Sequence, residues 1–345
     1  MTSSMTHRVA GHSIGFVALC AACTPSLDPP WVLARDRELA LRVEVVTQGP
    51  YGDTLDPEKP TTNEVLPLDT VLARPLIVGP DGIIPLRDLS PQWYLCGGNG
   101  NCLLRADATA LRPCDLEFLA PDEPCALAGA DSLEFKLGDF LPAEDADAVF
   151  LINRAPTIGF VASADVGPGT EACIDRIAER KSLEGCLWME RTLSLGSLSE
   201  VVDALTALGG EFEISESLAP LLDVPRNHNP AVSAFSVSVD GGEPDLYAPE
   251  ATITVPVGAT ITVSYQPSDS DIDRYTVEID GEKIDVEDQL QGRWFMSREV
   301  AQLEQALGQT SVVWEASRAD PVTAYFVVHD DRRAEAWGWL HFEPQ

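Results

Sequence analysis

The sequence predicts a mainly β protein with two β-sandwich domains behind an export signal. Short segments of alternating apolar and polar residues recur along the chain and are separated by clusters rich in glycine and proline, of which there are 25 and 26. This pattern is typical of sandwiches rather than of α/β sheets. A length of 345 residues is too great for one typical domain and suits two.

The first 22 residues are expected to be a signal peptide. The apolar run Ile14–Thr24 ends in small residues and a cysteine, and it is far shorter than the about 20 apolar residues that cross a membrane. Ala21-Ala22-Cys23 resembles the lipobox of bacterial lipoproteins, although Cys20 stands where that motif usually has leucine. The resemblance implies lipidation at Cys23. Ordinary cleavage after Ala22 is the alternative. Residues 23–37 are polar and proline-rich, which suits a short tether.

Beyond Cys20 and Cys23 there are six cysteines, and an even number in an exported chain indicates a disulfide framework. Their grouping along the chain favours pairing between neighbours, namely Cys96 with Cys102, Cys114 with Cys125 and Cys173 with Cys186. A zinc site is disfavoured, because the one Cys-x-x-Cys lies in the signal.

The first domain is predicted to span residues 38–224. Its expected strands are Leu39–Val46, Thr70–Val78, Gln92–Cys96, Ala148–Asn153 and Thr157–Ala164, with residues 97–147 as a disulfide-stapled insertion. In the third strand, Trp93 and Leu95 should share one face and Tyr94 the other.

Two short helices are predicted in the same domain. Thr170 is expected to cap Glu171–Arg180, whose apolar stripe contains Cys173, Ile174, Ile177 and Ala178. Ser197 and Glu200 form a capping box before a second stripe, which consists of Val201, Val202, Leu205 and Leu208 and ends at Gly209-Gly210. Both stripes are interpreted as core, with partner binding as the alternative.

The second domain is predicted to span residues 225–345, after the proline-bracketed segment Val224–Pro230. Seven short strands are expected: 231–239, 251–257, 260–266, 274–280, 311–315, 322–329 and 334–342. A helix capped by Ser297 and running to Leu307 is expected between the fourth and fifth strands.

Two features resemble Ig-like domains of uncharacterised bacterial lipoproteins. One is the succession of an opening strand, a second strand and Trp93-x-x-Cys96, and the other is Asn227-x-Asn229-Pro230 before a new strand. The resemblance implies two Ig-like or fibronectin-like sandwiches. Thr24 after the acylated cysteine, in place of aspartate, implies an outer-membrane lipoprotein of the cell envelope.

The formal net charge is −32 at pH 7, which excludes nucleic acid as an expected partner because such a surface repels phosphate. We interpret the charge as a solvating coat, with cation binding as the alternative. Asp269, Asp271 and Asp273 alternate in a loop between strands and supply the oxygen atoms that calcium accepts. The loop resembles the aspartate-rich loops of cadherin-like sandwiches. Calcium is therefore the one cofactor considered, against a solvated acidic turn.

The last two strands are expected to form a hairpin in which Tyr325 lies opposite Trp339 and Val327 opposite Trp337. The other face is wholly apolar and should be core. Tyr325, Trp337 and Trp339 would then share an outward strip able to stack on a glycan or to seat an envelope protein. The alternative is that a loop or the first domain covers the strip.

We expect a binding or scaffolding role, with the membrane as a partner through the lipid anchor, and no enzymatic activity. The Gly-x-Ser-x-Gly pattern at Gly11–Gly15 lies in the signal, where it lacks the strand and helix that would expose a nucleophilic serine. No catalytic residue is therefore assigned. The alternative is a periplasmic or secreted hydrolase whose paired carboxylates are hidden among the 55 acidic residues.

Overall fold

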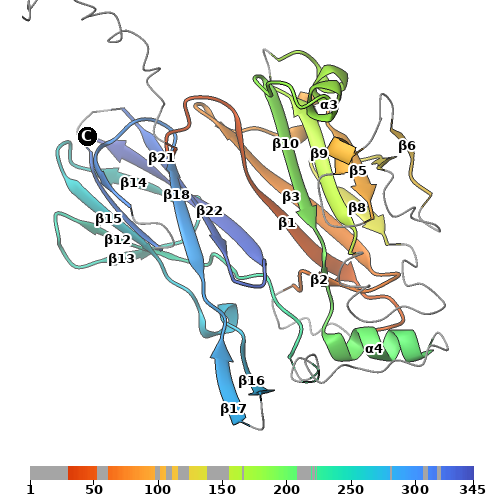
Figure 1. Cartoon of the computed structure of the whole chain (residues 1–345). Coiled ribbons are helices and arrows are strands. Elements are labelled where there is room, and N and C mark those ends of the chain that lie inside the picture. Colours follow the sequence, from red (N-terminus) through yellow and green to blue (C-terminus); the bar gives the residue numbers. More distant parts are fainter. Residues whose placement is uncertain are drawn as a thin grey trace, which may run out of the picture. The chain divides into compact units, whose positions relative to one another are not determined.

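Strands dominate the computed structural model, as the alternating pattern predicts (Figure 1). The structure describes residues 30–52, 61–97, 102–105, 111–115, 124–137, 155–164, 167–207, 219, 222, 224–279, 282–305, 310–316 and 320–345. Contacts group Trp31–Gln345 into one compact unit. Within the described residues, no helix is both long and apolar enough to cross a membrane.

Three sheets are built from residues before 224, which we call the N-terminal part. The first has the order β1-β3-β4, with β8 also paired to β3, the second has the order β10-β9-β5-β7-β6, and the third pairs β11 with β2. Their bounds are β1 Arg37–Thr47, β2 Glu64–Val65, β3 Thr70–Gly79, β4 Gly82–Ile83, β5 Gln92–Cys96, β6 Arg112–Pro113, β7 Cys125–Leu127, β8 Leu133–Lys136, β9 Thr157–Ser163, β10 Cys186–Thr192 and β11 Ser194–Leu195.

One apolar core joins the two larger N-terminal sheets, with side chains from β1, β3 and β8 on one side and from β5, β9 and β10 on the other. Trp93 and Leu95 lie in this core, whereas Tyr94 faces a second cluster around the helix α3, so the predicted alternation in β5 is confirmed. The predicted strand Ala148–Asn153 lies outside the described residues. Strand β1 is buried on both faces rather than one, because Leu41 and Val43 enter this core while Ala40 enters another cluster.

Among the described residues, the α-helices are short and lie in the N-terminal part. They are α1 Cys102–Arg105, α3 Thr170–Ala178 and α4 Leu198–Ala207, and the 3₁₀ turn η1 Leu86–Leu89 lies in the same part. Cys173, Ile174 and Ile177 of α3 are buried against β5 and β9, which confirms the predicted stripe as core. Thr170 does not cap α3, because it is the first helical residue and its hydroxyl donates to the carbonyl of Ser90.

The predicted start of α4 is confirmed. The Ser197 hydroxyl accepts from the Glu200 amide at 3.4 Å and lies 2.8 Å from the Glu200 carboxylate. Val201 is 5% exposed, so this end of the stripe is core. Leu208 and the expected Gly209-Gly210 stop lie outside the described residues.

All three predicted disulfides are present: Cys96–Cys102, Cys114–Cys125 and Cys173–Cys186. Each joins cysteines at most 13 residues apart. The third ties the N-terminal half of α3 to the start of β10. Together they fix the connections of the second sheet, where β5, β7 and β10 each contribute a cysteine.

The C-terminal part, residues 225–345, contains two larger sheets with the orders β13-β12-β15-β20-β19 and β14-β22-β21-β18, and the separate hairpin β16-β17. The bounds are β12 Phe235–Val239, β13 Asp245–Tyr247, β14 Thr252–Val255, β15 Thr260–Tyr265, the 3₁₀ turn η3 Asp269–Asp271, β16 Arg274–Ile279, β17 Glu282–Glu287, β18 Gln291–Met296, β19 Ala301–Glu304, β20 Ser311–Glu315, β21 Val322–His329 and β22 Glu335–Pro344.

All seven strands predicted here are present within a few residues of their expected ends. Strands β13, β17, β18 and β19 were not predicted. The helix expected from Ser297 to Leu307 is wrong, since Ala301–Glu304 forms the edge strand β19 beside β20. The Ser297 hydroxyl accepts from the amide of Thr323 in β21 instead of capping a helix. Strand pairing therefore overrides the helical signal.

The core of the C-terminal part lies between its two larger sheets. It is rich in aromatic rings, with Phe326 at its centre, 4.6 Å from Trp294 and 5.1 Å from Tyr265 between ring centroids. The register predicted for the last hairpin is confirmed, with Tyr325 opposite Trp339 and Val327 opposite Trp337. The face predicted to be core is buried throughout: Val322, Ala324, Phe326, Val328, Leu340 and Phe342.

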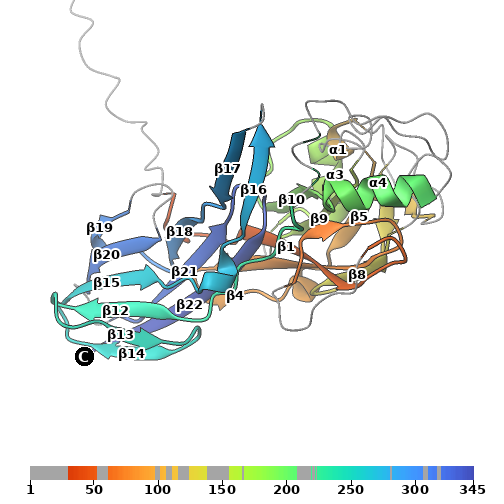
Figure 2. The ribbon, with the colours of Figure 1, turned by 90° about the horizontal axis from the view of Figure 1, so that it is seen from below.

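The hairpin β16-β17 extends away from the other strands of the C-terminal part in both views (Figures 1 and 2). Most of its side chains are exposed. Polar side chains pair across its two strands, as in an Arg274–Glu287 ion pair at 3.0 Å and a Thr276–Asp285 hydrogen bond of 2.7 Å. The loop that leads into it and the residue that follows it supply two carboxylates to the site described next.

Candidate functional site

Arg332, in the turn between β21 and β22, collects acceptors from several segments of the chain. Its Nε and Nη2 donate to Asp288 Oδ2 at 3.0 and 2.7 Å, and Nη2 also donates to Asp273 Oδ2 at 2.9 Å. Its Nη1 donates to the carbonyl of Pro225 at 2.8 Å. The guanidinium carbon lies 5.0 Å from the centroid of the Tyr275 ring. Only the planar fork of arginine satisfies such an arrangement.

The segment 225–230 connects the two parts and is bound by its backbone. Asn227 and Asn229 are 0% and 1% exposed. The Asn227 amide donates to Glu64 Oε2 at 2.9 Å. The Asn229 side chain donates to the carbonyl of Val43 at 2.9 Å and accepts from the amide of Glu335 at 3.1 Å. The connection is therefore a structural part of both sides rather than a solvated linker.

The polar residues around Arg332 and the connecting segment form one group, which we call the polar junction. We define it as Glu64, Arg226, Asn227, His228, Asn229, Asp273, Asp288, Asp330 and Arg332.

Burial alone would raise the pKa of Asp273, but hydrogen bonds from His228 and the charge of Arg332 outweigh burial and lower it. Asp273 is thus a stable anion between two donors.

Two other carboxyls of the junction behave in the opposite way. Burial raises the pKa of Glu64 to about 7, and the Asn227 amide and Arg332 only partly offset this. Burial likewise raises the pKa of Asp330 to about 6, against a hydrogen bond from the Ala334 amide. Both carboxyls therefore exchange protons within the physiological pH range.

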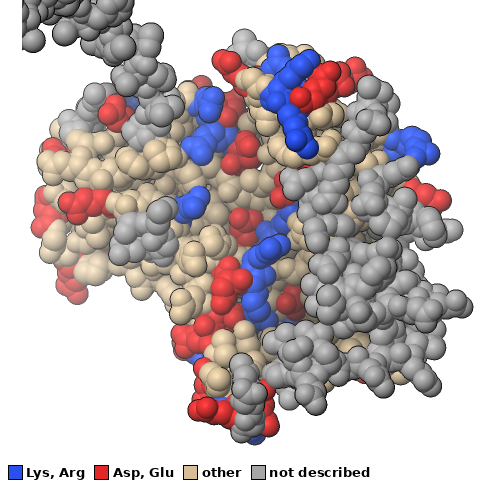
Figure 3. All heavy atoms as spheres, in the orientation of Figure 1, with Lys and Arg blue, Asp and Glu red and all other residues tan. Residues whose placement is uncertain are grey.

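A second ion pair lies beside the junction. Arg191 of β10 donates from Nη1 to the carbonyl of Leu41 at 2.7 Å and to Glu335 Oε2 at 2.9 Å. The same carboxylate oxygen accepts from the Leu41 amide at 3.0 Å. Glu335 of β22 thus provides a hydrogen-bond acceptor for a backbone amide of β1. Acidic and basic side chains also lie close together near the centre of the face drawn in Figure 3.

Tyr325, Trp337 and Trp339 do not form an outward strip. Tyr325 is 1% exposed, and the two indoles are partly buried beside it. The covering residues belong to the N-terminal part, with Leu33, Ala40, Leu76 and Val78 in the same cluster. The correction follows from β1, whose second apolar face packs on the hairpin.

The expectation that Asp269, Asp271 and Asp273 converge on one cation is wrong. Asp271 is buried and accepts from the amides of Ser268 at 2.6 Å and Ala231 at 2.8 Å. The Asp269 side chain is fully exposed, and Asp273 belongs to the polar junction. In the described parts of the chain, no group of three or more His, Cys, Asp or Glu residues is arranged to hold a metal ion.

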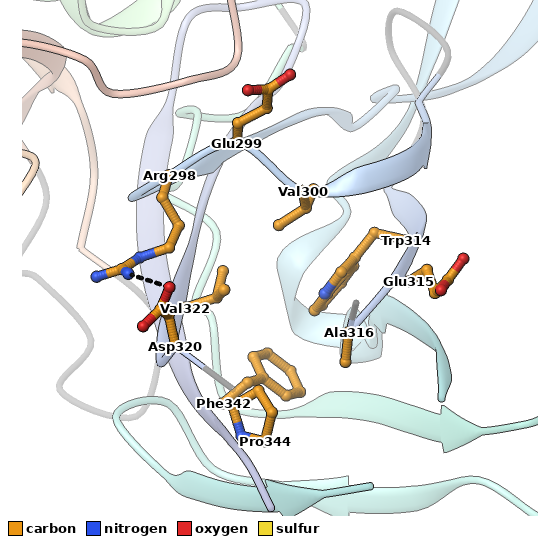
Figure 4. Close-up of a pocket in the computed structure, with 10 residues that line it drawn as sticks. All are labelled: Arg298, Glu299, Val300, Trp314, Glu315, Ala316, Asp320, Val322, Phe342 and Pro344. Atoms are coloured by element: carbon orange, nitrogen blue, oxygen red, sulfur yellow. Dashed lines mark ion pairs between the residues drawn. The ribbon is translucent and has the colours of Figure 1, made fainter. Parts of the chain in front are cut away.

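A hollow in the C-terminal part is lined by residues of β20, β21 and β22 and of the segment before β19 (Figure 4). Its volume is about 340 Å³, including space open to solvent. Trp314 and Phe342 meet edge to face at 4.9 Å in its floor, and an Arg298–Asp320 ion pair of 3.6 Å lies at its rim. The hollow is mostly apolar and shallow.

A shallow basin lies beside α3. Arg176 and Lys181 line it, together with Gly167 and Gly185. Arg176 donates to the carbonyl of Glu184 at 3.0 Å, and Lys181 pairs with Glu179. Both cations already have partners, so the basin offers little free positive charge.

Sequence reasoning identified Asn227, Asn229 and Pro230 as a boundary but did not predict the polar junction. One signal was present in the sequence. Asn227 and Asn229 are two residues apart, so on an extended segment both amide side chains point to the same side and can bind the same neighbouring surface. Their acceptors and donors come from β1, β2 and β22, more than 100 residues away in each case. Spacing cannot reveal such partners.

Comparisons with known proteins assign no family. No family model matches the chain, and no curated protein matches it. Among solved structures, the chain is similar to dimeric latent PorU from Porphyromonas gingivalis, with 9% identity and a TM-score of 0.18. The match covers 90% of this chain and 24% of that one, and at this TM-score it carries no argument.

Proposed function

We propose that this protein is an exported binding or scaffolding protein of the bacterial cell envelope, anchored to the outer membrane by lipid at Cys23. The observation that carries the proposal is the set of three disulfides. Disulfides persist in exported proteins and are rare where thiols are kept reduced. The short apolar run before Cys23 supports the same location.

We further propose that both parts are Ig-like sandwiches. In the C-terminal part, the orders β12-β15-β20-β19 and β14-β22-β21-β18 correspond to the A-B-E-D and A′-G-F-C arrangement of such domains. The parallel pairing of β14 with β22 supports the A′ assignment. In the N-terminal part, two sheets enclose one core, and the insertion between β5 and β9 carries two of the disulfides.

Scaffolding is supported by how the two parts are connected. The polar junction holds the connecting segment by its backbone, and an apolar cluster of Leu33, Phe295 and Tyr325 lies between the parts. Such contacts restrict hinge motion, which suits a protein that holds partners at a fixed spacing. A net charge of −32 disfavours nucleic acid, so the partner class is a glycan or another envelope protein.

Metabolic labelling with a fatty-acid analogue tests the anchor. The expected result is label on the wild-type protein and on a Cys20→Ala variant, and none on Cys23→Ala. Cys20 is the matched control because it lies in the same signal. Label on Cys23→Ala, or an intact precursor in the cytosol with free thiols, would contradict the proposal.

Binding is tested with the mature chain on a glycan array and against purified envelope fractions, with and without calcium. For a binder, we expect one class of glycan or envelope protein to retain the chain saturably, and this retention should be lost after the disulfides are reduced. Release of hydrolysed products from glycan or peptide substrates would favour the alternative of a hydrolase.

A further inference from the structure

The cations of the polar junction are already matched by acids other than Glu64 and Asp330. Arg226 pairs with the carboxylate of Glu200. Arg332 pairs with Asp288 at 2.7 Å and with Asp273 at 2.9 Å. Its distance to Glu64 is 4.0 Å. Glu64 therefore shares Arg332 with two closer carboxylates, and Asp330 makes no ion pair among the described residues.

Both carboxyls are well placed to accept hydrogen bonds in either protonation state. Glu64 accepts from the Asn227 amide at 2.9 Å, and Asp330 accepts from the Ala334 amide at 2.7 Å. A neutral carboxyl keeps these bonds through its carbonyl oxygen. An ionised one also keeps them but places a charge that neighbouring cations only partly offset at sites that are 9% and 5% exposed, which is costly.

Opening the junction would relieve that cost, because water would then solvate the charge. Glu64 belongs to β2 of the N-terminal part, and its partner Asn227 belongs to the connecting segment. The charged groups that face Glu64 and Asp330 are Arg191, Arg226, Arg332, Glu200 and Asp288, from β10, the connection, the β21-β22 turn, α4 and the residue after β17. His228 is bound to Asp273 and contacts neither carboxyl.

We propose that the polar junction is a proton-controlled lock. With Glu64 and Asp330 protonated, the segment 225–230 is held against β1 and β2. When they lose their protons, the segment releases and the two parts gain freedom to move. The lock would make an envelope scaffold rigid in mildly acidic surroundings and looser in mildly alkaline ones.

The size of the effect follows from proton linkage. A carboxyl whose pKa is raised by folding stabilises the closed form at low pH, and this contribution is lost as pH rises through the raised value. For Glu64, with a pKa of about 7 when closed and 4.5 when open, the opening constant should rise on the order of 50-fold between about pH 5 and pH 8. Asp330 adds to this rise in the same direction.

Hydrogen exchange of the full mature chain between pH 5 and pH 8 tests the lock, after correction for intrinsic exchange rates. The Asn227 and Asn229 amides report opening, because both are bonded to the N-terminal part. Amides of β9 and β15, inside separate sheets, serve as references. Protection of Asn227 should fall with pH much more than that of the references.

A Glu64→Gln variant should remove most of this pH dependence while keeping the acceptor for Asn227, and Asp330→Asn should remove a smaller part. Glu287→Gln is the matched control, since Glu287 is exposed and paired on the hairpin β16-β17. Carbon-detected NMR titration of the Glu64 carboxyl in the wild-type protein gives a second measure that no substitution can disturb. Equal pH slopes for Asn227 and the references, an unchanged slope in Glu64→Gln, or a Glu64 carboxyl that titrates near its ordinary value would each overturn the lock.

Discussion

Replacing Arg332 by methionine should destabilise the protein far more than the same change at the next residue, Arg333. Arg332 makes three charged hydrogen bonds to Asp288 and Asp273, and its side chain is 16% exposed. Arg333 is exposed and in the same turn. Arg332→Met removes the charge and retains a flexible apolar stem beside Tyr275.

The expected loss can be worked out from the partner that is left behind. The Asp288 side chain is 2% exposed, so without Arg332 it becomes a buried carboxylate lacking its cation. Removing one partner of a buried pair costs about 3–5 kcal/mol. We therefore expect Arg332→Met to lower the free energy of unfolding by about 4 kcal/mol and Arg333→Met to change it by under about 0.5 kcal/mol.

Urea unfolding followed by tryptophan fluorescence measures these values, with the slope m compared between variants to check that the unfolding transition is unchanged. Combining Arg332→Met with Asp288→Asn should recover about 2 kcal/mol of the loss, because the amide does not leave a buried charge. The reasoning would be refuted if Arg332→Met cost less than about 1 kcal/mol, or if the double variant showed no coupling between the two sites.

Three further outcomes follow from the fold. Replacing Cys173 and Cys186 by serine should lower the free energy of unfolding by about 3 kcal/mol, since their loop has a separation of 13, and calorimetry with the oxidised wild type as reference measures it. Phe326→Ala should cost about 3–5 kcal/mol because the ring is fully buried among aromatic side chains, and a loss below about 1.5 kcal/mol in urea unfolding would contradict this packing. Calcium should not raise the melting temperature, because Asp271 is already engaged by backbone amides, so a rise that EDTA reverses would show a site that the packing does not predict.

Local patterns predicted much of the fold because they act between residues close in sequence. The alternation in Val322–His329 and in the strand after it fixed both the register and the buried face of the last hairpin. Ser197 and Glu200 fixed the start of α4. The spacing of the cysteines was enough to pair them, because short loops bring neighbouring cysteines together.

The errors occurred where distant segments compete for the same residues. The stretch after Ser297 has helix-favouring residues. It forms β19 instead, because strand pairing with the edge of β20 outweighs the helical preference. The aromatic strip was expected to face outward because one strand pair cannot reveal what lies on its second face. That face is covered by β1, about 300 residues earlier in the chain.

By itself, the sequence determined the strand content, the disulfide pairs and the register of the last hairpin, since each depends on spacing within a short stretch. Only the tertiary structure decided which polar residues are buried together. Glu64, Asn227 and Arg332 lie far apart along the chain, and their burial, charge balance and raised or lowered pKa values arise from packing between the two parts. Electrostatic effects of this kind depend on distance in space and on exclusion of water, neither of which is written in local sequence.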